Sequence, residues 1–308
     1  DNIKGQVDLN DCGLQSMERG KKDAVGEKKE SGKAFAGKSE RNQKKGHLLP
    51  FVRVAEAVAA AVAVLVISVN VSPTVANAME QVPVFGAIVK IVNFTTYSDK
   101  QEKKQMEATV RVPEVKVIGT DGKPLTRESK ELNAAVSGYL DKIIQMYKKD
   151  VAAVSDGEEG HEEITSDYRI VTNNERLFSL RVDTVIAMGG SDSFTKIYNI
   201  DKKTGKMITL KDLFHEGSDY KKRISDSIKE QMRAQMKKDS SKTYFLDDDQ
   251  PEWDFKQIKD DADFYISDNG ELTFVFDKYE VAPGYMGLVE FSVPTEKLSD
   301  IVKDGYLQ

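Results

Sequence analysis

The apolar positions of the chain are concentrated in one stretch, residues 57–79, which contains no charged residue. A helix of this length extends over roughly 30 Å, about the thickness of the hydrocarbon core of a bilayer. The apolar density is highest over residues 57–69, which is short for a membrane span and typical of a signal-peptide core. The pattern therefore predicts a membrane helix or an export signal, with a buried helix of a soluble protein as the weaker alternative.

The end of this stretch has the composition of a signal-peptidase site. Pro73 ends the helix, and Ala76 and Ala78 place small residues at the two positions that the peptidase reads, so cleavage would fall before Met79. Three interpretations remain open: a retained membrane anchor, a cleavable export signal, and an anchor that is cut on command.

The regions before and after the apolar stretch differ in charge. Up to Arg53 the chain holds 12 basic and 8 acidic residues, a net charge of +4, whereas the remainder holds 33 and 43, a net charge of −10. Basic residues before an apolar span predict a cytoplasmic N-terminus and an exported C-terminal part. The negative charge outside favours a basic protein as partner rather than nucleic acid, unless it only keeps an exported domain soluble.

These patterns predict five segments. Residues 1–47 are too poor in large apolar side chains to fold alone, and they account for most of a polar cytoplasmic tail at 1–50. A transmembrane helix is expected at 51–72. A juxtamembrane segment with the signal-peptidase site is expected at 73–105, with a polar linker over 95–107. The folded part would begin near Met106 and contain two modules, 106–205 and 206–300.

Beyond Met106 the periodicity changes between that of strands and that of helices. Helical spacing of apolar residues predicts a helix over 128–149 and a second one after Ser218, its expected N-cap. The predicted fold class is α+β, an exported domain with an antiparallel sheet and two main helices. Alternating apolar residues and turn residues predict about eight strands, at 106–118, 164–170, 177–188, 194–200, 207–210, 264–266, 272–276 and 288–293.

The sequence offers little for enzyme chemistry. The single cysteine, Cys12, precedes the apolar stretch, so the exported part has no thiol nucleophile and no internal disulfide. His161 and His215 are the candidate bases in that part, but neither has a second histidine at zinc-site spacing. The acidic run 247–249 lacks the Gly and Glu of a calcium loop. We therefore predict no enzyme activity, no metal and no cofactor.

Two loops are candidates for recognition. Residues 188–193 contain Gly189 and Gly190, which let the backbone approach a partner closely. Residues 279–285 form a rigid Pro-Gly turn with aromatic side chains, and a tyrosine there would provide a large contact area at low entropic cost. The alternative is that both loops are ordinary hairpin connections, with Tyr285 packed on the sheet.

Several blocks of the sequence resemble known domains. Residues 210–214 with 218–229, then 263–266, 274–277 and 279–287 (YEVAPGYMG), resemble the DUF3298 domain. Residues 106–190 are similar to the DUF4163 (PdaC-like) module that usually precedes it. Downstream of a single span, this pair resembles the RsiV-type anti-sigma factors that double as lysozyme receptors, and the resemblance covers residues 50–300.

The resemblance implies a mechanism. The cytoplasmic segment would hold an extracytoplasmic-function sigma factor inactive, and the exported domain would bind lysozyme, a strongly basic enzyme. Binding would expose the site after Ala78 to signal peptidase, and an intramembrane protease would then cut within residues 57–71. The released sigma factor would switch on envelope-defence genes. The chain would thus be a single-pass protein of the cell membrane with an extracellular C-terminal domain.

The resemblance also implies which residues contact lysozyme. They are Ser191 in the glycine-rich loop, with Ser193 as the alternative match, and Pro283, Gly284 and Tyr285 in the Pro-Gly-Tyr turn. Related modules often carry Gly-Gly-Ala-His where this chain has Gly-Gly-Ser-Asp, so a histidine-based role at that loop is not available here.

Two other functions compete with this one. A constitutively exported protein could bind the cell wall or inhibit lysozyme, with residues 57–69 only a signal core. An exported peptidoglycan hydrolase is the third hypothesis, and it would need a catalytic group that the sequence does not show. The 53 residues up to Arg53 are long for the start of an ordinary signal peptide, which favours the regulated receptor.

Overall fold

The computed structural model describes residues 86–247 and 252–307, all within one compact unit. The predicted tail, the predicted membrane helix and the cleavage-site residues Ala76, Ala78 and Met79 lie outside the described residues. Of the helices that are described, none combines the length and the apolar character needed to cross a membrane.

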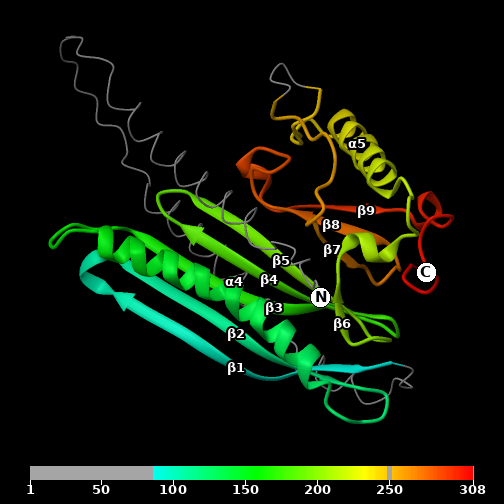
Figure 1. Ribbon diagram of the computed structural model, residues 1–308. Helices are drawn as coiled ribbons and strands as arrows, with labels where there is room; N and C mark the ends of the chain where they lie inside the picture. Colours follow the sequence, from blue (N-terminus) through cyan, green and yellow to red (C-terminus); the bar gives the residue numbers. More distant parts are fainter. Residues whose placement is uncertain (1–85, 248–251, 308) are drawn as a thin grey trace, which may run out of the picture. The chain divides into compact units, whose positions relative to one another are not determined.

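Most of the strands belong to one six-stranded sheet, whose strands lie in the order of the sequence (Figure 1). Hairpins join β3 to β4, β4 to β5 and β5 to β6, so these pairs are antiparallel, as predicted. The strands are β1 (Ile88–Gln101), β2 (Met106–Ile118), β3 (Glu162–Asn173), β4 (Leu177–Ala187), β5 (Ser191–Asp201) and β6 (Lys206–Ile208).

The first strand corrects the prediction of a polar linker over 95–107 and of a folded part that begins near Met106. β1 pairs antiparallel with β2 from Ile88 through Gln101, so the sheet begins within the segment expected beside the membrane. β1 is an edge strand in which Val89 is buried and most other side chains are exposed. A polar sequence is compatible with this position, because an edge strand contributes few side chains to a core.

The sheet is not entirely antiparallel, which corrects the predicted fold class in one detail. β2 and β3 are parallel neighbours, and their pairing extends from Met106 opposite Glu162 to Val110 opposite Ser166. Parallel neighbours need a crossover connection, and helix α4 (Thr126–Ala153) provides it. Side-chain periodicity reports the face of a strand and not its direction, so the sequence pattern did not distinguish the two cases.

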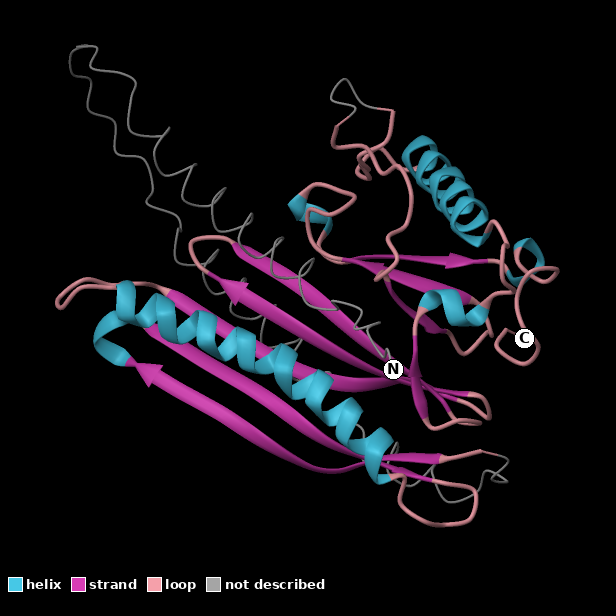
Figure 2. Ribbon diagram, in the orientation of Figure 1, coloured by secondary structure: helices cyan, strands magenta, loops and turns pink. Residues whose placement is uncertain are grey.

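Helix α4 packs along one face of the sheet (Figure 2). Asn133 of α4 accepts a hydrogen bond from the Val115 N–H and donates one to the Val115 carbonyl, both at 2.8 Å. These bonds satisfy the backbone N–H and carbonyl of Val115, which lies beyond the end of the pairing between β2 and β3. The buried residues of α4 confirm the predicted helix and are Leu132, Val136, Leu140, Ile143, Ile144 and Tyr147.

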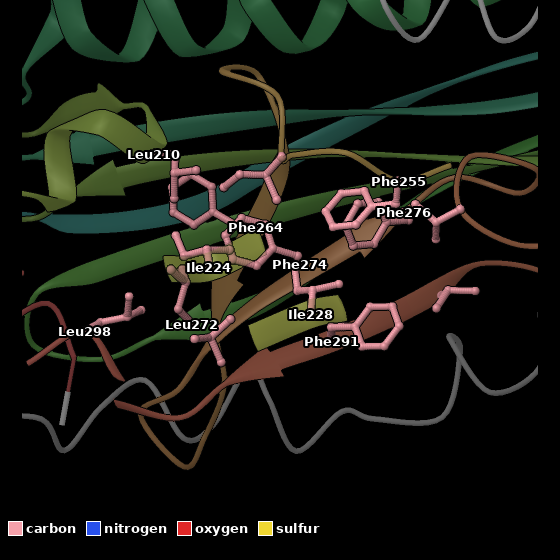
Figure 3. Packing of buried hydrophobic residues seen from close by; sticks show 14 of the residues in the cluster. Leu210, Ile224, Ile228, Phe255, Phe264, Leu272, Phe274, Phe276, Phe291 and Leu298 are labelled. Atoms are coloured by element: carbon pink, nitrogen blue, oxygen red, sulfur yellow. The ribbon is translucent and has the colours of Figure 1, made fainter. Parts of the chain in front are cut away.

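The second sheet has three antiparallel strands: β7 (Asp263–Ile266), β8 (Leu272–Phe276) and β9 (Val289–Val293). It packs against helix α5 (Tyr220–Lys238), as the aromatic and aliphatic core in Figure 3 shows. The predicted second helix is confirmed, but Ser218 is not its cap. Asp219 precedes the helix, and the Ser218 hydroxyl donates to the His215 carbonyl at 2.7 Å.

The two sheets meet at β4 and β5. Leu177 of β4 belongs to the core of the second sheet, whereas the next residue, Phe178, belongs to the core under α4. Successive side chains of a strand point to opposite faces, so β4 is buried on both sides. The fold is therefore α+β with two main helices, as predicted, and contains two hydrophobic cores.

Candidate recognition surface

The glycine-rich loop is the tight connection between β4 and β5. Ala187 pairs with Ser191 across the hairpin, and the Met188 N–H donates to the Gly190 carbonyl at 2.8 Å. Gly189 has a φ of 66°, a conformation that favours glycine. As a result, Ser191 lies exposed at the first position of β5.

The Pro-Gly-Tyr turn connects β8 to β9 through a short 3-10 helix, η4 (Gly284–Met286). Val281 and Ala282, just before it, are buried at 1% and 2% exposure and anchor the turn in the core. Tyr285 is 69% exposed, which overturns the interpretation that it packs on the sheet. Its hydroxyl donates to the Ser241 carbonyl at 3.1 Å, so the ring is held outward in a defined orientation.

Tyr279 is a second exposed aromatic residue of this connection, at 54% exposure. Its φ is 69°, which a bulky side chain adopts only where the surrounding structure holds it. A Cβ atom at Gly284 would lie 2.2 Å from the Tyr279 ring, so the glycine leaves the space that the ring fills. The Pro-Gly sequence thus positions Tyr279 as well as Tyr285.

Lys278 joins the two loops. Its ammonium group donates to the Ser191 carbonyl and, at 3.2 Å, to the Ser191 hydroxyl. Its backbone N–H donates to the Ser193 carbonyl at 3.1 Å, and its ammonium lies 5.0 Å from the centre of the Tyr279 ring. Through this one residue the two predicted loops become neighbours.

Two carboxylates fix the same edge of β5. The Thr195 N–H donates to Asp277 at 2.8 Å and the Ile197 N–H donates to Asp263 at 2.6 Å. Strand β6 pairs with β5 only from Asn199 to Asp201, so side chains of the second sheet take the place of a strand along the remaining edge. These bonds fix the position of the second sheet relative to β5, the strand that begins at Ser191.

Burial shifts the pKa values of the charged groups between the loops. It raises the pKa of the Asp192 carboxyl to about 6, although the Ser193 N–H and the Lys278 ammonium oppose this. Burial lowers the pKa of Lys278, and the Asp192 charge opposes that shift. The pKa of Asp277 lies well above its usual value because of burial, and the charges of Glu280 and Asp263 raise it further.

The structure therefore links Ser191, through Lys278, to the connection that carries Pro283, Gly284 and Tyr285. The alternative match, Ser193, contributes its backbone carbonyl to Lys278. Sequence reasoning missed Lys278 and gave Tyr279 no separate role. The Asp-Lys-Tyr sequence directly after β8 was the available signal, but nothing in it indicated a contact with a loop 87 positions earlier.

The other candidate residues lie apart from any metal-binding arrangement. Among residues 86–247 and 252–307, no three His, Cys, Asp or Glu side chains are placed to share a metal ion. Asp247 makes two hydrogen bonds to the Arg233 guanidinium, at 2.8 and 3.2 Å. His161 lies 2.9 Å from Glu159 in an exposed pair.

Taken together, the fold and the surface define a two-core α+β protein in which a turn with two exposed tyrosines is joined to a glycine-rich loop. Residues 211–296 match the family described as "Protein of unknown function (DUF3298)". The chain is 39% identical to the anti-sigma-V factor RsiV of Bacillus subtilis over 235 residues. The aligned region is 76% of this chain and 78% of that protein. The chain belongs to the RsiV family of anti-sigma factors.

A second relative is more distant. The peptidoglycan-N-acetylmuramic acid deacetylase PdaC of Bacillus subtilis is 21% identical over 183 residues, 58% of this chain and 38% of that enzyme. A DUF3298 family protein of Pseudomonas aeruginosa PAO1 is similar in structure, with 14% identity and a TM-score of 0.49 over 70% of this chain and 96% of that one. A Bacteroides fragilis member of the same family has a TM-score of 0.40 and 16% identity, and the match covers 69% of this chain and 94% of that one.

Proposed function

We propose that the chain is a single-pass membrane anti-sigma factor whose exported domain senses and binds lysozyme. Ser191, Tyr279, Pro283, Gly284 and Tyr285 form its recognition surface. The observation that carries this proposal is the pair of Lys278 bonds that joins the Ser191 loop to the Pro-Gly-Tyr turn. Two separate loops would each offer one or two side chains, whereas the joined loops present one surface that is fixed before the partner arrives.

Charge supports lysozyme as the partner. The chain beyond Arg53 has a net charge of −10, and lysozyme is a strongly basic protein. Opposite net charges accelerate encounter and favour this partner over acidic proteins and nucleic acids. We assign residues 106–205 to a DUF4163-like module and 206–300 to a DUF3298-like module. The two hydrophobic cores support a division into two modules, but the first core also includes Ala87 and Val89, and Leu177 belongs to the second.

The cytoplasmic half of the proposal rests on membership of the anti-sigma family. Residues 1–50 would hold an extracytoplasmic-function sigma factor, and residues 51–72 would cross the membrane. Lysozyme binding would allow signal peptidase to cut after Ala78, with Ala76 and Met79 completing the site. An intramembrane protease would then release the sigma factor. The proposed activity is regulatory, with no catalytic residue and no cofactor.

Binding is tested by calorimetric titration of the full chain, in detergent micelles, with lysozyme. Tyr285→Ala removes an exposed aromatic anchor and is expected to weaken binding by about 1–3 kcal/mol. Phe94→Ala is the matched control, because Phe94 is 48% exposed and lies on β1. Undetectable binding of the unmodified chain at low and moderate salt would refute the proposal, and equal losses in both variants would refute the surface.

The alternative is a constitutively exported wall-binding or lysozyme-inhibiting protein. The long segment before the apolar stretch favours the regulated factor. The two are separated by following cleavage of the membrane-inserted chain with and without lysozyme. The receptor is cut slowly until lysozyme is added, and Ala78→Trp blocks the cut. Rapid cutting without lysozyme would establish the alternative, and normal cutting of Ala78→Trp would place the site elsewhere.

A further inference from the structure

Few large apolar side chains are exposed in the described part of the chain, and they fall into two groups. Within the described part of the chain, Val92 and Phe94 lie on β1, and the remaining three are Trp253, Tyr279 and Tyr285. Tyr279 and Tyr285 belong to the recognition surface. Trp253 is 59% exposed and belongs to the connection between α5 and β7, to which neither the sequence nor the proposed function gives a role.

The connection that carries Trp253 is bonded to the Pro-Gly-Tyr turn. The Phe245 N–H donates to the Val281 carbonyl at 2.9 Å, and the Phe255 N–H donates to the Phe245 carbonyl at 2.8 Å. The Tyr285 hydroxyl donates to the Ser241 carbonyl of the same connection. Hydrogen bonds therefore hold the described residues of this connection against the turn.

The indole of Trp253 is supported without being buried. It meets the half-buried Phe245 ring edge-on, with 6.1 Å between ring centres and 81° between ring planes. Phe245 donates its N–H to Val281, and Val281 lies two positions before Pro283 in the Pro-Gly-Tyr turn. A large apolar group that is fixed by a neighbour and left open to solvent loses little entropy when a partner covers it.

Acidic residues neighbour these aromatic groups in the sequence: Glu252 and Asp254 flank Trp253, and Glu280 follows Tyr279. Asp254 is paired with Lys256 and Glu280 with Lys259. Tryptophan and tyrosine are enriched among the residues that dominate binding energy, and the net charge of −10 beyond Arg53 complements a basic partner.

We propose that Trp253 is a further anchor of the lysozyme-binding surface, which then extends from the Ser191 loop across the Pro-Gly-Tyr turn to the connection between α5 and β7. This inference rests on the proposed function. It specifies the partner's footprint: a basic surface with apolar groups placed to cover the indole of Trp253 as well as the two tyrosine rings.

The first test uses the fact that Trp253 is the only tryptophan of the chain. Full chain labelled with 5-fluorotryptophan gives one fluorine resonance, which is followed by NMR as unlabelled lysozyme is added. The resonance is expected to shift and to lose its sensitivity to solvent deuteration, because the indole becomes covered. Cytochrome c, another basic protein, is the control. An unchanged resonance at saturating lysozyme would overturn the inference.

The second test separates the contact from a structural role of the ring. Trp253→Ala is expected to weaken lysozyme binding about tenfold or more, and Trp253→Phe to weaken it less, with the melting temperature unchanged in both. If the unmodified chain binds and Tyr285→Ala weakens binding while Trp253→Ala does not, the inference fails and the proposed function stands. If the unmodified chain does not bind, the proposed function itself fails.

Discussion

At the scale of single residues, Gly284 determines how the recognition surface is presented. Its missing side chain leaves room for the ring of Tyr279, whose backbone is held at a φ of 69°. Tyr285 follows Gly284 directly and leaves the turn in a fixed direction through its bond to Ser241. The missing side chain of Gly284 therefore makes room for one aromatic contact, and the bond to Ser241 orients the other.

The change Gly284→Ala tests this role. The new Cβ atom would lie 2.2 Å from the Tyr279 ring, so the ring must move and lysozyme binding is expected to fall by about 1–3 kcal/mol. Gly138→Ala is the matched control. Gly138 lies inside α4 with open space at its Cβ position, so this change is expected to stabilise the fold by up to about 1 kcal/mol. Unchanged affinity in Gly284→Ala would contradict the role of Tyr279.

Asp192 makes stability depend on pH. Its pKa of about 6 in the fold lies above that of an exposed aspartate, so the folded state binds a proton more tightly than the unfolded state. The Asp192 contribution therefore makes stability fall as the pH rises from about 4 to about 6, with no further change on either side of that window. The buried Asp277, whose pKa is also raised, contributes with the same sign.

The variant that tests this is Asp192→Asn, compared with the unmodified chain by urea unfolding between pH 4 and pH 7. Lys278 is the charged group that faces Asp192. The variant is expected to lose less stability between pH 4 and pH 6 than the unmodified chain, while Asp277 leaves a residual slope. Identical slopes would show that Asp192 titrates as an exposed carboxyl does.

At the scale of elements, a buried arginine joins the two sheets. Arg181 of β4 is 3% exposed and donates to Asp183 at 2.7 Å and to Glu290 of β9 at 2.6 Å. Glu290 also accepts a hydrogen bond from the Tyr265 hydroxyl of β7 at 2.9 Å. Strands from both sheets are therefore linked through the ion pair of Arg181 and Glu290.

Glu290→Ala removes this link. Arg181 then keeps Asp183 but loses the partner that satisfies its second nitrogen, and an unsatisfied buried donor is costly. We expect the free energy of unfolding in urea to fall by about 1–3 kcal/mol. Glu230→Ala is the control, because Glu230 forms an exposed pair with Lys297, and its loss is expected to fall within experimental error. Equal effects of the two changes would contradict the account of the buried link.

At the scale of the whole molecule, the elements that the sequence predicted well are those with strong periodicity. Both helices carry regular apolar stripes, and the buried residues of α4 were the ones expected. In α5, Ile224, Ile228 and Met232 are buried as expected, but Ser225 and Ser227 are buried as well and Met236 is only partly buried. β1 could not be predicted in this way, because Val89 alone of its residues is buried. The turn residues of the recognition surface could be predicted, since Gly189, Pro283 and Gly284 restrict the backbone locally.

The assembly of that surface could not be predicted, because it depends on contacts between distant parts of the chain. Lys278 reaches Ser191 across 87 positions, and Thr172 of β3 exchanges hydrogen bonds with the backbone of Ile266 across 94. Neither contact leaves a periodic pattern in the sequence. The Tyr279 backbone conformation is likewise a result of packing against Gly284 and not a preference of tyrosine.

The central claim is that two loops act as one surface for lysozyme. Hydrogen–deuterium exchange of the full chain, followed by mass spectrometry with and without lysozyme, tests it most directly. The account predicts slower exchange on binding in the peptides that contain residues 188–193 and 279–287. The exchange of peptides from β1 is expected to stay unchanged. Slowing in only one of the two loops, or in neither, would contradict it.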